Sequence, residues 1–157
     1  MKKIIKYLGI MLTAALLCIM LIACGGGETN IYNFSNTTIE GDSIEGAGAS
    51  GLSYIASSYE ARYKGSHIEI IEGSKESYGG IKWTMQDNEV ITISYHKEGD
   101  KYILSGDYVD HLASTMWNVE LPQDILKNRF MWGAKTNDGF KIVMEYGDQI
   151  VLNFTKA

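Results

Sequence analysis

The second half of the chain alternates apolar and polar residues with a period of two, and this alternation restricts the fold more than any other feature. Residues 81–86, 91–96, 140–146 and 150–154 each place an apolar side chain at every second position. Such alternation is typical of β-strands with one buried face. Turn residues separate these segments at Asp87-Asn88, Glu98-Gly99-Asp100, Asn137-Asp138-Gly139 and Gly147-Asp148. Because short connections join antiparallel neighbours, we predict an antiparallel meander of six or seven strands.

One N-terminal helix is predicted at about residues 51–64, before the meander. Its apolar residues recur at intervals of three and four, which is the spacing of one helical face: Leu52, Ile55, Ala56, Tyr59 and Tyr63. Ser50 can cap the start of this helix, and Gly65 can end it. A sheet with one apolar face needs a second layer. We therefore expect an α+β fold, in which the helix packs on the meander and the sheet either stays open or closes towards a barrel.

Three further elements are predicted from shorter patterns. Residues 67–72 form a strand directly after the helix. Residues 112–119 form another strand, because Ala113, Thr115 and Trp117 share one side of an alternating segment. Pro122 is suited to the first position of a short helix that continues to about residue 130.

The N-terminus has the organisation of a secretory signal. Lys2, Lys3 and Lys6 precede the uncharged segment 8–23, which is shorter than the roughly 20 residues of a membrane-spanning helix. The last three residues of this segment and the next one read Leu21-Ile22-Ala23-Cys24, which resembles the lipobox of bacterial lipoproteins. This resemblance implies that the signal, residues 1–23, is cleaved and that Cys24 is linked to diacylglycerol. The alternative is an uncleaved anchor helix with an incidental cysteine.

The expected mature chain consists of an anchor, a tether and one domain. Residues 24–45 are rich in Gly, Asn, Ser and Thr, so we expect a lipidated cysteine and a flexible tether with at most a short strand at 31–34. Residues 46–157 then form a single globular α+β domain. Loss of the signal removes three of the 14 basic residues and none of the 19 acidic ones. This acidic balance argues against a nucleic-acid partner and against adhesion to anionic lipid.

A glycine motif lies at the start of the predicted helix. Gly46, Gly48 and Gly51 have the spacing G-x-G-x-x-G, and the strand after the helix ends at Glu72. In this order, residues 46–80 resemble the FAD-binding fingerprint of flavin amine oxidases. The resemblance implies that the glycines contact a pyrophosphate and that Glu72 binds ribose hydroxyls. The residues also allow another interpretation, a glycine-rich tether that continues into a capped helix, because the preceding segment is too polar for a central parallel strand.

Asp107, Asp110 and His111 are the best candidates for metal or acid–base chemistry. They lie close together between two predicted strands. Carboxylates with an imidazole could hold a divalent metal ion or transfer protons. A solvated acidic turn would have the same composition.

The sequence favours a binding or interaction module over an enzyme. No set of nucleophile, base and orienting group is recognisable, so no catalytic residue and no cofactor is assigned. We expect a lipid-anchored protein on the extracytoplasmic side of the cell membrane, whose partner is an envelope protein, a peptide or a small ligand. Two alternatives stay open: a nucleotide- or flavin-binding protein that uses Gly46–Glu72, and a small metal-assisted hydrolase that uses Asp107, Asp110 and His111.

Overall fold

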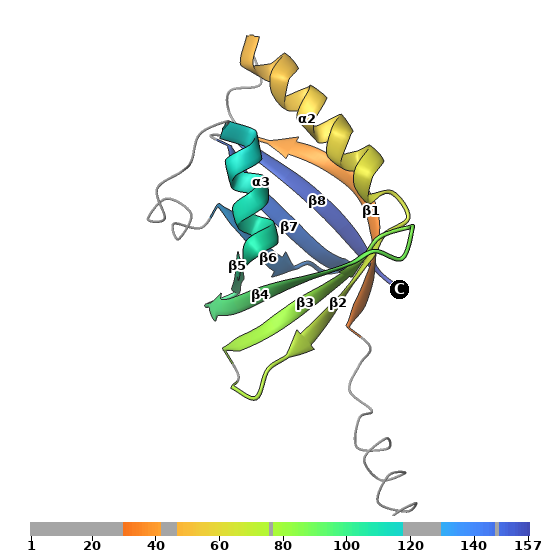
Figure 1. Cartoon of the computed structure of the whole chain (residues 1–157), viewed down its shortest axis with the longest axis vertical. Helices are drawn as coiled ribbons and strands as arrows, with labels where there is room; N and C mark the ends of the chain where they lie inside the picture. Colours follow the sequence, from red (N-terminus) through yellow and green to blue (C-terminus); the bar gives the residue numbers. More distant parts are fainter. Residues whose placement is uncertain (1–29, 42–46, 76, 118–129, 147) are drawn as a thin grey trace, which may run out of the picture.

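The described part of the chain folds into an eight-stranded closed β-barrel with two helices (Figure 1). The computed structural model describes residues 30–41, 47–75, 77–117, 130–146 and 148–157. Each strand is antiparallel to the next along the chain, and β8 pairs with β1 to close the barrel. The antiparallel meander is thus confirmed, and of the two forms left open, an open sheet or a barrel, the structure has the barrel. The predicted number of six or seven strands is wrong. The elements are β1 (Ile31–Glu40), α2 (Ala47–Tyr63), β2 (His67–Glu72), β3 (Tyr78–Thr84), β4 (Val90–Glu98), β5 (Lys101–Ser105), α3 (Asp107–Trp117), β6 (Met131–Lys135), β7 (Gly139–Tyr146) and β8 (Asp148–Lys156).

The connections place both helices at the same end of the barrel. Successive strands of a meander run in opposite directions, so their ends alternate between the two openings. Helix α2 follows the end of β1 and α3 follows the end of β5, and both strand ends belong to one opening. We call this the helix-covered end. The start of β1, the end of β8 and the β2–β3, β4–β5 and β6–β7 turns belong to the other opening, the hairpin end.

Strand β1 corrects the expected tether. Residues 31–40 form a ten-residue strand of the barrel, although their composition predicts a flexible segment with at most a short strand. Tyr32 and Phe34 face the core, and after a β-bulge that follows Phe34 the inward positions are Thr37 and Ile39. The bulge adds one residue and interrupts the period of two. The alternation that identifies the other strands is missing here, because the bulge places two exposed residues, Ser35 and Asn36, in succession and the polar Thr37 faces inward.

Side chains fill the interior of the barrel. The fully buried residues that point inward include Trp83, Phe140, Ile68, Ile81, Ile93, Ile142, Met144, Ile150 and Leu152. The Trp83 ring lies 5.6 Å from the Phe154 ring, and its Nε1 donates a hydrogen bond to Ser66 Oγ at 3.0 Å. A barrel of eight strands is narrow enough for side chains to occupy its lumen. The lumen is therefore a hydrophobic core, and the cavities described below lie at the helix-covered end.

The helices differ in extent and position from the predicted ones, because α2 follows β1 and is therefore not N-terminal to the sheet. Helix α2 begins at Ala47, four residues earlier than expected, and ends at Tyr63 before Gly65, whose φ of 75° suits a helix end. The strand predicted at 112–119 is wrong, because residues up to Trp117 belong to α3. The apolar residues of that segment fit one face of a helix and one face of a strand equally well. In the structure they form the buried face of a helix, to which Val109, Leu112 and Ala113 belong.

Two expectations fall largely or wholly outside the described residues. One is the short helix from Pro122, of which only Phe130 is described. The other is the signal and lipobox up to Cys24. Within the described ranges, no helix has the length and apolar character needed to cross a membrane.

Candidate functional site

The two helices enclose a groove of about 320 Å³ at the helix-covered end. Helix α2 contributes residues spaced mostly by four, so they form one stripe along its surface. Helix α3 contributes residues from its first two turns. We call this cavity the helix groove; it is lined by Tyr54, Ile55, Ser58, Tyr59 and Arg62 of α2 and by Tyr108, His111 and Leu112 of α3. Tyr54 is 78% exposed, so one wall of the groove is an aromatic ring open to solvent.

The helix groove is held in place by contacts to the barrel core. Tyr63 of α2 is fully buried, and its ring centroid lies 4.3 Å from that of Trp83. The hydroxyl oxygens of Tyr63 and Tyr108 are 2.7 Å apart, which is a hydrogen bond between the two helices. The Tyr59 ring stacks on the Tyr63 ring, with centroids 5.7 Å apart. This chain of contacts fixes both helices relative to the sheet and to each other.

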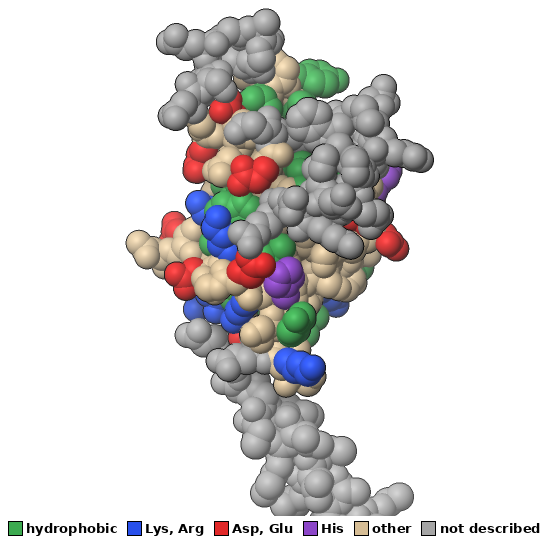
Figure 2. All heavy atoms as spheres, turned by 90° about the vertical axis from the view of Figure 1, so that its left-hand side faces the viewer, with side chains coloured by type: hydrophobic (Ala, Val, Ile, Leu, Met, Phe, Trp, Pro, Cys, Tyr) green, Lys and Arg blue, Asp and Glu red, His purple; other side chains and the backbone are tan. Residues whose placement is uncertain are grey.

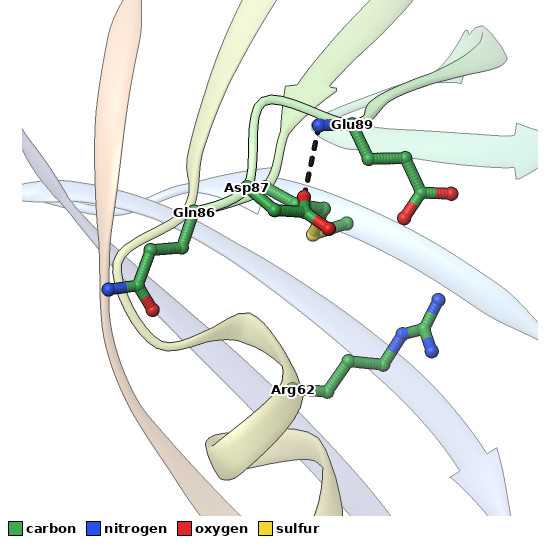
Figure 3. Close-up of a pocket in the computed structure, with 5 residues that line it drawn as sticks. Arg62, Gln86, Asp87 and Glu89 are labelled. Carbon is green, nitrogen blue, oxygen red and sulfur yellow. Dashed lines mark hydrogen bonds between the residues drawn. The ribbon is translucent and has the colours of Figure 1, made fainter.

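A second cavity of about 360 Å³ lies beside the β3–β4 turn and shares Arg62 with the helix groove. It is lined by Arg62, Met85, Gln86, Asp87 and Glu89. Figure 3 shows that the Arg62 guanidinium and the Glu89 carboxylate both extend into this turn cavity. Asp87 Oδ1 accepts a hydrogen bond from the Glu89 amide at 3.0 Å and so shapes the turn.

Arg62 is the charged group at the junction of the two cavities. Its pKa is raised chiefly by the electrostatic interaction with Tyr108, with smaller contributions from Tyr63 and Glu89, against a lowering by burial. An arginine side chain stays protonated in proteins, and these interactions favour its charged form further. The described residues that line the helix groove include no carboxylate, whereas Asp87 and Glu89 line the turn cavity. The helix groove is thus an apolar and aromatic surface with a permanent cation at one end.

The buried Tyr63 predicts a loss of stability at alkaline pH. Burial is the main cause that raises the pKa of Tyr63 well above its ordinary value, and Tyr108 raises it further. A folded-state pKa above the unfolded one means that the stabilisation is complete below about pH 10 and is lost as the pH rises beyond it. We expect the free energy of unfolding, measured in urea, to fall above that pH. Tyr63→Phe should weaken this fall, and an unchanged pH dependence in that variant would contradict the assignment.

The structure does not form the nucleotide site that the glycine motif implies. Cys24 and Gly46 lie outside the described residues, Gly48 and Gly51 lie in the first turns of α2, and Glu72 ends β2. The fingerprint requires parallel strands on either side of its helix. Here β1 and β2 are antiparallel, and Glu72 pairs with Gly79 in a further antiparallel ladder. Figure 1 shows the start of α2 and the end of β2 at opposite ends of the molecule, so Gly48 and Gly51 do not share a site with Glu72.

The residues predicted to bind a metal ion lie in a different secondary-structure element from the one expected. Asp107, Asp110 and His111 lie in the first turns of α3, not between two strands. The described ranges hold no group of three His, Cys, Asp or Glu side chains that could bind a metal ion. Acidic residues at the start of a helix interact favourably with its dipole, which gives the two aspartates a structural role. Of the three residues, His111 is the one that lines the helix groove.

Sequence reasoning missed most of the groove residues. Tyr54, Ser58 and Arg62 recur at intervals of four directly beside the apolar stripe of α2, and this spacing is the signal that could have identified them. Tyr108 could not be placed, because its segment was not recognised as a helix.

Comparison of the chain with protein-family models, with curated proteins and with solved structures found no significant match.

Proposed function

We propose that this protein is a lipid-anchored extracytoplasmic binding module that presents the helix groove away from the membrane. The observation that carries this proposal is the position of the first described residue. Asn30 lies at the hairpin end, where its carbonyl accepts a hydrogen bond from the Ile70 amide at 2.9 Å. The groove lies at the opposite end of the barrel.

The short distance in sequence between the lipobox and the barrel supports this orientation. Residues 25–29 separate Cys24 from Asn30. A fully extended chain advances about 3.3–3.6 Å per residue, so this segment spans at most roughly 20 Å. A lipid on Cys24 would therefore keep the hairpin end close to the bilayer surface and the helix groove far from it.

The distribution of charge supports the same orientation. The hairpin end carries most of the described lysines, namely Lys75, Lys97, Lys101, Lys135 and Lys156, together with Glu72, Glu98, Asp100 and Asp138. The helix-covered end is rich in carboxylates, namely Glu40, Glu60, Asp87, Glu89, Asp107, Asp110 and Asp148. On the face in Figure 2, acidic side chains extend to the top, whereas lysine and arginine side chains lie in the middle and lower parts. An anionic bilayer repels the helix-covered end more strongly.

The composition of the helix groove supports ligand binding. Binding sites for small molecules combine apolar and aromatic walls with a few polar groups that orient the ligand. The groove has this character, with three tyrosines, two aliphatic side chains and Arg62, Ser58 and His111 as polar groups. It is also a surface between two helices fixed to a rigid barrel, so ligand binding requires no rearrangement of the fold.

Replacement of the two cysteines tests the anchor. We expect Cys24→Ala to abolish incorporation of a radioactive fatty acid and to leave the signal uncleaved, because no thiol remains for the diacylglyceryl group. Cys18→Ala is the matched control, since this cysteine lies inside the signal and should leave lipidation unchanged. The measurement is lipid labelling and electrophoretic size in membrane fractions. Labelling of the Cys24→Ala variant at the level of the unmodified protein would overturn the anchor.

A further inference from the structure

We propose that the helix groove binds a small organic carboxylate with an apolar or aromatic body, whose carboxylate is held by Arg62. This inference rests on the proposed binding function and specifies its ligand. It follows from the order of groups along the groove, in which apolar and aromatic side chains lead to a cation.

Arg62 can bind a carboxylate while it keeps its present contacts. A guanidinium carries five N–H donors in a planar fork that matches the two oxygens of a carboxylate. Tyr108 interacts with the Arg62 guanidinium, and the Tyr63 ring centroid lies 6.0 Å from its central carbon. Within the part of the chain that the structure describes, Arg62 forms no ion pair with a carboxylate. Donors of Arg62 therefore remain for a ligand.

The body of the ligand is defined by the walls of the groove. Tyr54, Tyr59 and Tyr108 present rings, and Ile55 and Leu112 present aliphatic surface. Aromatic rings favour stacked or edge contacts with another ring. A volume of about 320 Å³ accommodates a small molecule of one ring with a short chain. The exposed Tyr54 ring lies at the open side of the groove, where it can cover such a ligand.

The charges around Arg62 favour a single negative charge. Among the described residues that line the helix groove, Arg62 is the one permanent cation, so it can neutralise one anionic charge. Asp87 and Glu89 line the adjoining turn cavity and repel further negative charge. A dianionic phosphate would keep uncompensated charge next to these carboxylates. A monocarboxylate matches the site better.

A pair of probes that differ only in charge tests this inference. The full protein is placed in lipid nanodiscs and titrated by calorimetry with 4-phenylbutanoate and with the neutral 4-phenylbutanamide, and empty nanodiscs serve as the blank. Because hydrogen bonds to charged groups are about twice as strong as neutral ones, we expect the carboxylate to bind about tenfold more tightly or better. Arg62→Gln should remove this preference. Lys64→Gln is the matched control, since Lys64 is exposed just after α2 and lines neither cavity.

Three outcomes would overturn the inference. Equal affinity for the acid and the amide would show that the groove does not select charge. A preference that survives Arg62→Gln would place the anion elsewhere. Tighter binding of phenyl phosphate than of 4-phenylbutanoate would exclude the monocarboxylate. None of these outcomes affects the anchor, which the Cys24 and Cys18 variants test separately.

Discussion

Trp83→Ala should destabilise the protein by about 3–5 kcal/mol, the usual cost of removing a large aromatic side chain from a core. Trp83 is fully buried and contacts the rings of Tyr63, Tyr108 and Phe154. Its loss opens a cavity where the sheet meets both helices. Since a domain is typically stable by about 5–15 kcal/mol, the variant should unfold at a much lower urea concentration, as followed by circular dichroism.

Two comparison variants separate the lost volume from the lost hydrogen bond. Trp83→Phe keeps a ring in the core but leaves Ser66 Oγ without its donor, so we expect a smaller loss than with alanine. Val90→Ala alters a side chain that is 49% exposed on the neighbouring strand and should change stability by about 0.5 kcal/mol or less. Similar stabilities of Trp83→Ala and Val90→Ala would show that Trp83 is not at the centre of the core.

Phe34→Asp tests whether residues 31–40 are part of the barrel. Phe34 packs against the core, with ring centroids 5.6 Å from Phe154 and 6.3 Å from Tyr63. An aspartate there removes these contacts and places a carboxylate beside apolar rings, which costs at least about 3–5 kcal/mol. We expect the variant to be largely unfolded or aggregated at 37 °C, as measured by circular dichroism and size-exclusion chromatography.

Asn33→Asp is the control for this prediction. Asn33 is the neighbouring residue on the same strand, and its side chain is exposed. A carboxylate at this position stays in water, so stability should change by about 0.5 kcal/mol or less. If the segment were a flexible tether, both variants would behave alike.

The sheet was predictable because most of its strands have one apolar face and tight turns. Ile91, Ile93 and Tyr95 point inward as their alternation predicts, and the turn before them contains Asn88 with a φ of 68°. Strand β1 was not predictable in the same way, since its bulge shifts the inward positions. Strand β6, whose residues Met131–Gly133 are buried in succession, does not alternate either and was not predicted. Closure of the barrel depends on β1 and β6, so the number of strands could not be obtained from periodicity alone.

The candidate site was less predictable than the fold, because it arises between two helices that are distant in sequence. Arg62 and His111 approach one cavity only after α2 and α3 reach the same end of the barrel. The motifs that stand out in the sequence mislead here for a physical reason. The glycine spacing forms a dinucleotide site only between parallel strands, and the strands on either side of α2 are antiparallel. Asp107, Asp110 and His111 lie at the start of helix α3.

The most direct test of the account is the distance of each end of the barrel from the bilayer. A fluorophore is attached to a cysteine at Ser74→Cys, in the β2–β3 turn, or at Ser57→Cys, on the exposed surface of α2, in the lipidated protein in vesicles. Quenching by a lipid with a quencher on its headgroup is then measured. We expect strong quenching at position 74 and little at position 57. Equal quenching at both positions, or stronger quenching at position 57, would contradict a groove that faces away from the membrane.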